Sequence, residues 1–266
     1  MLTQSNKIED LFSVSEKVVL ITGAGGLGSA YAEAFAENGA KVVLASRTVS
    51  KAETEAKILA DRGLLITAAA LDVTDKKQVK AFAADLQQRF GRIDVLIHTA
   101  ASCKLHPGLE DCEETFRFNM NTNLMGSYFL NQAIGNIMAT QPTGGSIINI
   151  NTQSAFSVNS PDGMSYAVSK AALMHLTKYF AVLYAEKGVT VNGIAPIWID
   201  TPMMSGRSQD YLNKAISQVP MGRMSHVEDY VGMGVFLAGA GSRFITGQTF
   251  LVDGGWSVSR VFRFNP

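Results

Sequence analysis

The chain has 266 residues, of which 47% are hydrophobic and 17% are charged. Such a composition can bury a substantial core, which excludes a disordered or fibrous protein. The 23 basic and 23 acidic residues give a formal net charge of zero. No overall field therefore draws the chain to nucleic acid or to an anionic membrane, and we expect neither partner. Any anionic ligand must be bound by a local site.

The cysteines and the first residues bear on the compartment. The chain has two cysteines, Cys103 and Cys112, without metal-ligand spacing, so we expect no disulfide framework and no metal site. Residues 1–17 are polar and mixed in charge, unlike a secretory signal. No apolar run reaches the roughly 18 residues of a membrane span. The sequence predicts a soluble, cytoplasmic protein.

Short apolar runs alternate with amphipathic segments along the whole chain. Strands are predicted over residues 17–22, 41–45, 65–71, 93–98, 146–150, 189–194 and 249–252. Helices are predicted over residues 29–38, 49–61, 75–90, 113–139, 164–187, 211–218 and 227–238. Strands that are apolar throughout indicate a parallel sheet with helices on both faces. We predict an α/β fold with a doubly wound, mostly parallel (Rossmann-type) sheet.

No linker rich in proline, glycine or serine divides the chain. We therefore predict a single domain over residues 1–266, with residues 1–14 as an N-terminal extension.

A glycine-rich turn joins the first predicted strand to the helix that follows. It reads Gly23-Ala24-Gly25-Gly26-Leu27-Gly28. Glycines allow a sharp turn and a close approach of the backbone to a diphosphate, and a helix N-terminus favours negative charge. The alternative is an ordinary glycine-rich turn without a ligand. The position after a strand and before a helix favours a dinucleotide site.

The end of the second strand bears on which dinucleotide binds. It reads Ala45-Ser46-Arg47, without a carboxylate that could accept from a ribose 2′-hydroxyl. The planar guanidinium of Arg47 could instead bind a 2′-phosphate. We expect NADP(H), with NAD(H) as the second choice. The alternative for Arg47 is a solvated loop residue.

Two residues of the long helix after the fifth strand have a spacing useful in catalysis. Tyr166 and Lys170 are four residues apart and therefore lie on one helix face. A nearby ammonium and an oxidised nicotinamide both favour the phenolate, so Tyr166 could exchange a proton with an alcohol. The alternative is a buried tyrosine beside a lysine whose amine reaches solvent. Thr152 and Ser154 follow the strand at 146–150, which would bring a hydroxyl to the same sheet edge.

From about Leu11 to Ser257 the sequence resembles the short-chain dehydrogenase/reductase family in its compact single-domain form. Within that family it resembles the gluconate 5-dehydrogenase and 3-oxoacyl-carrier-protein reductase branches. The matching segments, in chain order, are 22–28, 71–73, the helix around Asn123, 149–152, 166–170, 192–196, 201–203, 246–248 and 252–255.

The resemblance implies hydride transfer between the nicotinamide and a carbinol carbon. Tyr166 would be the general acid/base and Lys170 would hold the nicotinamide ribose. Thr152 would orient the substrate oxygen, and Asn123 would help hold a water in a proton relay. The expected cofactor-binding residues are Gly23, Gly25, Gly26, Leu27, Gly28, Ser46, Arg47, Asp72, Val73, Ala100, Tyr166, Lys170, Pro196, Ile199 and Thr201. The expected substrate contacts are Thr152, Ser154 and Trp198, the last within a lid over about residues 197–220.

Four positions depart from the family pattern. The glycine loop is one residue shorter than usual. His98-Thr99-Ala100-Ala101 stands where the family has Asn-Asn-Ala-Gly, which alters hydrogen bonding between the central strands. Thr152 replaces a serine, and Pro196-Ile197 replaces Pro-Gly.

Several other residues that could be functional also have a structural interpretation. His98 at a strand end is expected to be a hydrogen-bonded structural residue rather than an acid. His106 and Cys103 either line the pocket or lie at the surface, and Cys112 is expected to be a packing residue. Trp198 either closes a lid or packs locally.

Two functions from different classes fit these observations. The first is an NADP(H)-dependent alcohol dehydrogenase or ketone reductase acting on a small polyhydroxy or oxo compound. The second is a regulatory protein that binds the dinucleotide without turnover. The Tyr166 helix has a second apolar face (Leu173, Leu176, Phe180 and Leu183). In the family that the sequence resembles such helices commonly meet across subunits, so the resemblance implies a homotetramer rather than a monomer.

Overall fold

The computed structural model describes residues 7–106, 110, 112–201, 204 and 206–259. Its centre is a seven-stranded sheet in the order β3-β2-β1-β4-β5-β6-β7, with every neighbouring pair parallel. The strands are β1 (Val18–Thr22), β2 (Lys41–Ser46), β3 (Ile66–Ala70), β4 (Val95–His98), β5 (Gly145–Ile150), β6 (Val189–Pro196) and β7 (Thr249–Val252). The order reverses between β1 and β4, so the doubly wound prediction is confirmed.

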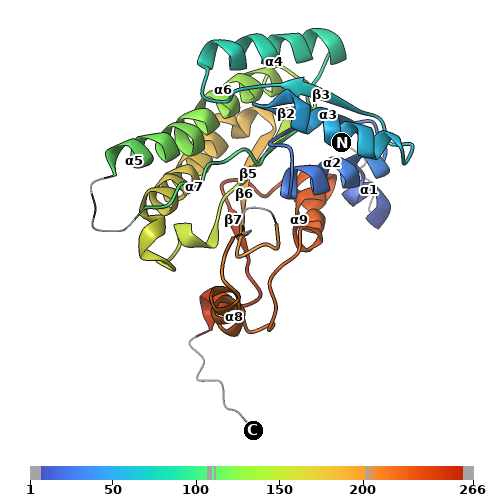
Figure 1. The fold of residues 1–266 in the computed structure, drawn as a ribbon. Coiled ribbons are helices and arrows are strands. Elements are labelled where there is room, and N and C mark those ends of the chain that lie inside the picture. Colours follow the sequence, from blue (N-terminus) through green and yellow to red (C-terminus); the bar gives the residue numbers. More distant parts are fainter. Residues whose placement is uncertain (1–6, 107–109, 111, 202–203, 205, 260–266) are drawn as a thin grey trace.

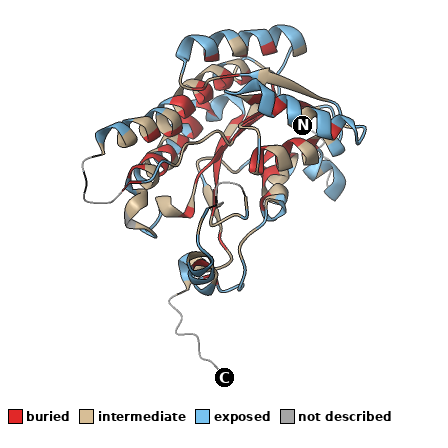
Figure 2. Cartoon of the chain, in the orientation of Figure 1, coloured by how far each residue is buried: buried red, intermediate tan, exposed pale blue. Residues whose placement is uncertain are grey.

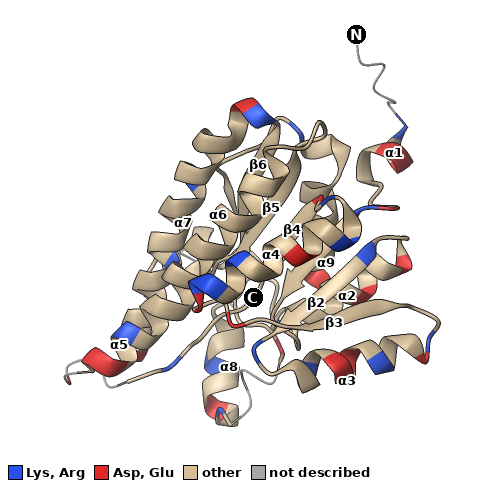
Figure 3. Cartoon of the chain, turned by 90° about the horizontal axis from the view of Figure 1, so that it is seen from above, with Lys and Arg blue, Asp and Glu red and all other residues tan. Residues whose placement is uncertain are grey.

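Helices cover both faces of the sheet, as Figure 1 shows. On one face lie α2 (Leu27–Glu37), α3 (Val49–Ala60) and α9 (Glu228–Ala238), and on the other α4 (Lys76–Phe90), α6 (Gly126–Met138) and α7 (Met164–Tyr184). The buried residues lie along the strands and on the inner sides of the helices (Figure 2). Basic and acidic residues are interspersed over the outer helices (Figure 3). Within the described ranges, no helix has the length and apolarity to cross a bilayer.

Two short helices belong to the segments predicted as the N-terminal extension and the lid. Helix α1 (Ile8–Phe12) lies in the predicted N-terminal extension, and the Phe12 ring packs 5.8 Å from that of Phe236 in α9. Helix α8 (Gln209–Ser217) lies in the predicted lid, which projects away from the sheet after β6 (Figure 1). Residues 202, 203 and 205 of that lid lie outside the described residues, as do residues 1–6 of the extension.

The predicted helix over residues 113–139 differs in its middle. It consists of α5 (Glu113–Met120), a π-helical turn (Asn121–Met125) and α6. The extra residue in a π turn shifts the hydrogen-bond ladder, and such turns often occur at functional sites. Here the turn contains Asn123, whose carbonyl accepts a 2.6 Å hydrogen bond from the Ser127 hydroxyl.

The prediction that an apolar face of α7 is free to contact another subunit is wrong for most of the residues named. Leu173 and Phe180 are buried in the chain's own core, and Leu176 packs against it. Leu183 alone of the four is exposed, at 67%. The sequence pattern shows that α7 has two apolar faces, but it does not show which face meets the sheet.

A close approach between α9 and α2 depends on one glycine. Tyr31 is fully buried, and its hydroxyl donates to the Tyr230 carbonyl at 3.0 Å. A Cβ at Gly234 would lie 2.3 Å from the Tyr31 ring, whereas a Cβ at Gly232, two residues earlier on the same helix, meets nothing within 4 Å.

Gly234→Ala should therefore lower the free energy of unfolding by about 1–3 kcal/mol, the usual cost of overpacking a core. The matched control Gly232→Ala should raise it by up to about 1 kcal/mol, because alanine is the better helix former. Urea denaturation measures both. Equal stabilities of the two variants would contradict this packing.

Candidate active site

Tyr166 and Lys170 lie on the first half of α7, which crosses the carboxyl end of β5. Lys170 is 2% exposed, and its Nζ donates to the Ile150 carbonyl at 2.6 Å. The Tyr166 phenol lies near the side chain of Thr152, two residues beyond that strand end, and this neighbour lowers the pKa of the phenol. The Ser154 N–H in turn donates to the Thr152 hydroxyl at 3.3 Å. The structure thus brings the predicted phenol, hydroxyl and amine to one sheet edge.

Burial dominates the electrostatics of this site. It lowers the pKa of Lys170 to about 8, because removal from water disfavours a charge. Burial also raises the pKa of Tyr166, the nearby Cys103 thiol raises it further, and the Thr152 side chain opposes the rise. Without a bound coenzyme, the protein's own groups therefore favour the neutral phenol. Lys170 directs its ammonium to the Ile150 carbonyl.

Asn123 connects the site to the segment after β4. Its amide nitrogen donates to the Ser102 carbonyl at 2.8 Å and to the Ser169 hydroxyl at 2.9 Å. Its amide oxygen accepts from the Ser102 N–H at 2.8 Å. The predicted role of Asn123 in holding a water stays a prediction. Its observed contacts fix residue 102 against α7.

Asn119, which we did not single out from the sequence, acts on the same segment. Its amide nitrogen donates to the Ser165 hydroxyl and to the Lys104 carbonyl, and its amide oxygen accepts from the Ser102 hydroxyl. Asn119 and Asn123 are one helical turn apart, and this spacing was the available signal. Together they hold Cys103 close enough to Tyr166 and to Lys170 for its charge to act on each of them.

His98 is fully buried in a hydrogen-bond chain between β1 and α6. Ser127 donates to the Asn123 carbonyl, so the Ser127 oxygen accepts from His98 Nε2 at 2.9 Å. His98 Nδ1 then accepts from the Thr22 hydroxyl at 2.7 Å, which requires the neutral ring. The expectation of a hydrogen-bonded structural histidine is confirmed. Burial, with the charge of Lys170, lowers the pKa of His98 to about 3.

His98 should make stability depend on pH. As pH falls from 6.5 toward 3, the unfolded chain binds a proton that the folded chain does not, so the free energy of unfolding falls by up to about 1.4 kcal/mol per pH unit. His98→Asn should be less stable than the wild type at pH 7 but should lose less stability between pH 7 and 4.5. Urea denaturation at both pH values tests this, with exposed His175→Asn as the control. Equal pH slopes for the wild type and His98→Asn would contradict it.

The glycine turn has the shape that a diphosphate needs. Gly23 has a φ of +95°, and a Cβ at Gly28 would lie 1.7 Å from the Gly23 carbonyl oxygen. The following helix, α2, begins at Leu27. Among the described residues, the N–H groups of Gly26 and Leu27 form no hydrogen bond, so they remain as donors for an anion. The residues present therefore fit a dinucleotide.

Thr99, one of the departures from the family pattern, supports this turn. Its hydroxyl is 2.6 Å from the Thr22 carbonyl and 3.2 Å from that of Gly23. With His98 bound to Thr22, the altered motif still ties the ends of β1 and β4 together.

The other predicted cofactor residues lie at the same edge of the sheet. Ser46 is half-buried and Arg47 is exposed at the end of β2. Asp72 accepts from the Thr74 N–H and hydroxyl at 2.9 and 2.7 Å. Val73 is buried and its side chain packs against Gly126. Ala100 follows β4, Pro196 ends β6, Ile199 forms an isolated bridge with Ser225, and a Cβ at Gly26 would lie 3.4 Å from the Thr201 methyl.

Trp198, the predicted lid residue, packs edge-on to Trp256 with ring centroids 6.2 Å apart. Its carbonyl accepts from the Ser225 N–H and hydroxyl. This is the local packing that we kept as the alternative, and a substrate contact stays a prediction.

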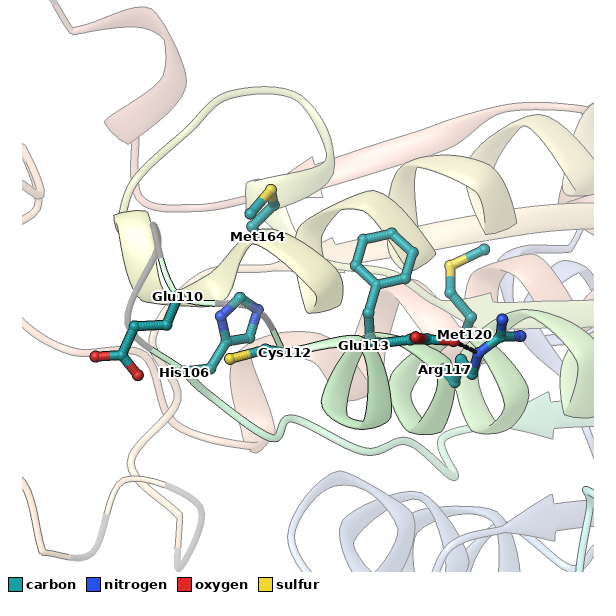
Figure 4. A pocket seen from close by; sticks show the side chains of 8 residues that line it. His106, Glu110, Cys112, Glu113, Arg117, Met120 and Met164 are labelled. Carbon is teal, nitrogen blue, oxygen red and sulfur yellow. Dashed lines mark hydrogen bonds and ion pairs between the residues drawn. The ribbon is translucent and has the colours of Figure 1, made fainter.

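Two open cavities flank the site. One, of about 540 Å³, lies in the lid and is lined by Asp200, Thr201, Met204, Gly206, Arg207, Leu212 and Met224. The other, of about 550 Å³, lies between α5 and the start of α7 (Figure 4) and is lined by His106, Glu110, Cys112, Glu113, Phe116, Arg117, Met120 and Met164. The second cavity contains an ion pair between Glu113 and Arg117 but none of the predicted catalytic residues.

The comparisons with known proteins agree with this geometry. The family described as enoyl-(acyl carrier protein) reductase matches residues 23–257. A galactitol 2-dehydrogenase of Agrobacterium fabrum is 35% identical, over 91% of this chain and 98% of that protein. The chain belongs to the short-chain dehydrogenase/reductase family. Members of this family of oxidoreductases use a nicotinamide dinucleotide.

Solved structures of the family have the same fold. A short-chain type dehydrogenase/reductase from Mycobacterium marinum has a TM-score of 0.90 at 33% identity, over 95% of this chain and 100% of that one. A gluconate 5-dehydrogenase from Burkholderia cenocepacia in complex with NADP and tartrate has a TM-score of 0.89 at 31% identity, over 95% and 100%. The resemblance to the family read from the sequence is therefore confirmed.

Proposed function

We propose that this protein is an NADP(H)-dependent oxidoreductase that interconverts a secondary alcohol and a ketone on a small polyhydroxy or oxo compound. The observation that carries the proposal is the Tyr166 phenol, which lies near Thr152 and one helical turn from the buried ammonium of Lys170. Relatives that act on galactitol and gluconate support the substrate class.

The coenzyme would be held by the glycine turn, with its diphosphate against the free N–H groups of Gly26 and Leu27. When bound, its nicotinamide supplies or accepts the hydride. For ketone reduction the neutral phenol of Tyr166 is the appropriate form, because it donates a proton to the carbonyl oxygen. The Thr152 hydroxyl orients that oxygen by a hydrogen bond. Lys170, held by the Ile150 carbonyl, presents a positive charge that stabilises the phenolate left behind.

Tyr166→Phe removes the proton donor while it keeps the ring. Turnover should fall by at least about 100-fold, the usual contribution of general acid–base catalysis. The dissociation constant for NADPH should change by less than about threefold, because the ring still packs in place. Carbonyl reduction and fluorescence titration measure the two quantities.

Tyr179→Phe is the matched control, because Tyr179 lies on the same helix and is 62% exposed. Turnover that survives Tyr166→Phe would disprove the assigned role. Coenzyme binding by the wild type without turnover of any sugar acid, polyol, steroid or acyl thioester would support the alternative, a dinucleotide-sensing protein.

The choice of NADP(H) depends on Arg47, which is exposed and, among the described residues, forms no salt bridge. The NADP bound to the Burkholderia cenocepacia enzyme is consistent with that choice.

Arg47→Gln should weaken NADPH binding by about 10- to 100-fold, since it removes charge-assisted hydrogen bonds to the 2′-phosphate. NADH binding should change by less than about twofold. Lys51→Gln, a nearby exposed cation on α3, is the control in the same fluorescence titration. Equal weakening of both coenzymes, or tighter binding of NADH than of NADPH by the wild type, would exclude this role.

We also propose a homotetramer, on the basis of an exposed apolar face of α7. That face comprises Val168, Tyr179, Val182 and Leu183, which are 44%, 62%, 78% and 67% exposed, and patches of this kind mark association sites. A cytoplasmic location stays a prediction.

A further inference from the structure

The lid contains a cation, Arg207, that is paired with no acidic side chain among the residues that the structure describes. The Arg207 guanidinium lies over the Tyr211 ring, with its carbon 4.8 Å from the ring centroid. The side chain is half-buried, and within the part of the chain that the structure describes it forms no ion pair with a carboxylate. Stacking fixes the plane of the guanidinium and leaves its N–H edge available as a donor.

The position of Arg207 relates it to the reacting groups. It lines the lid cavity of about 540 Å³ together with Thr201 and Met204. The Cys103 thiol lies near both Arg207 and Lys170, and the two positive charges oppose the rise that burial causes in its pKa. Cys103 is also close to Tyr166. A ligand that reaches from the phenol past Cys103 would therefore bring its far end to the guanidinium.

Of the acidic residues that the structure describes near Arg207, neither Asp200 nor Asp210 forms an ion pair with it. Asp210 is paired with Lys214 at 2.9 Å. Asp200 lines the same cavity but is exposed and, among the described residues, makes no ion pair with Arg207. Its negative charge in the cavity disfavours a doubly charged ligand group more than a singly charged one.

We propose that Arg207 binds a carboxylate at the end of the substrate opposite the reacting carbon, so the substrates are hydroxy or oxo acids rather than neutral polyols. This inference rests on the proposed function of the same site. The planar fork of the guanidinium matches a carboxylate with two parallel hydrogen bonds. Arg207 is then the specificity-determining residue, and Tyr166 remains the acid/base.

The first test uses pairs of substrates with the same chain length and hydroxyl configuration, such as D-gluconate and D-sorbitol. The wild type should show a higher kcat/KM for the acid. Arg207→Gln should lower that value by about 10- to 100-fold, the usual effect of losing a charge-assisted hydrogen-bonded pair, while the polyol changes by less than about twofold. Arg207→Lys should recover part of the loss, and Lys214→Gln, an exposed cation on α8, should change neither.

A second measurement does not depend on turnover. Titration calorimetry with the coenzyme complex of Tyr166→Phe should detect binding of the acid, and adding Arg207→Gln should weaken that binding by a similar factor. This readout holds even where the chosen acid is turned over slowly.

Three results would overturn the inference while the proposed function stands. These are equal losses for acid and polyol, weaker NADPH binding in Arg207→Gln (which would place Arg207 on the coenzyme), and a preference for a sugar phosphate over the matching acid. Absence of any turnover that depends on Tyr166 would instead overturn the proposed function itself.

Discussion

The hydrogen bond from the Lys170 ammonium to the Ile150 carbonyl fixes the relation between α7 and the end of β5. Ile150 is the last residue of the strand, and Thr152 lies two residues further along the chain. Because a buried ammonium needs a partner, the helix cannot shift without a large cost. The phenol one turn earlier is thereby held near Thr152. The chemistry that we propose requires these three groups to remain in register.

A layer of buried polar side chains lies next to that contact. Asn123 ties the segment after β4 to α7, and His98 links β1 to α6 through Ser127. Asn123, Ser127 and His98 all have hydrogen-bond partners in this layer. The network therefore stabilises a single arrangement of the site. It also explains why His98-Thr99 can replace the family's usual residues: the ring and the hydroxyl bridge the same strand ends by different atoms.

The lid contributes the part of the site that lies beyond the sheet, after β6. It carries an apolar contact between Trp198 and Trp256 and an arginine stacked on Tyr211. A fixed acid/base centre combined with a separate lid allows one fold to act on different substrates, because the lid can change without disturbing the buried contacts of Lys170.

The sequence by itself determined the order of strands and helices, the glycine turn and the Tyr166–Lys170 pair, because these depend on local periodicity and on residues a few positions apart. Tertiary structure decided which face of α7 is covered, how Asn119 and Asn123 hold Cys103 near the phenol, and that Arg207 of the lid comes close enough to Cys103 for its charge to act on the thiol. These relations join residues far apart in the chain. Burial, which sets the pKa of Tyr166, Lys170 and His98, is a property of everything packed around a group, so no short stretch of sequence contains it.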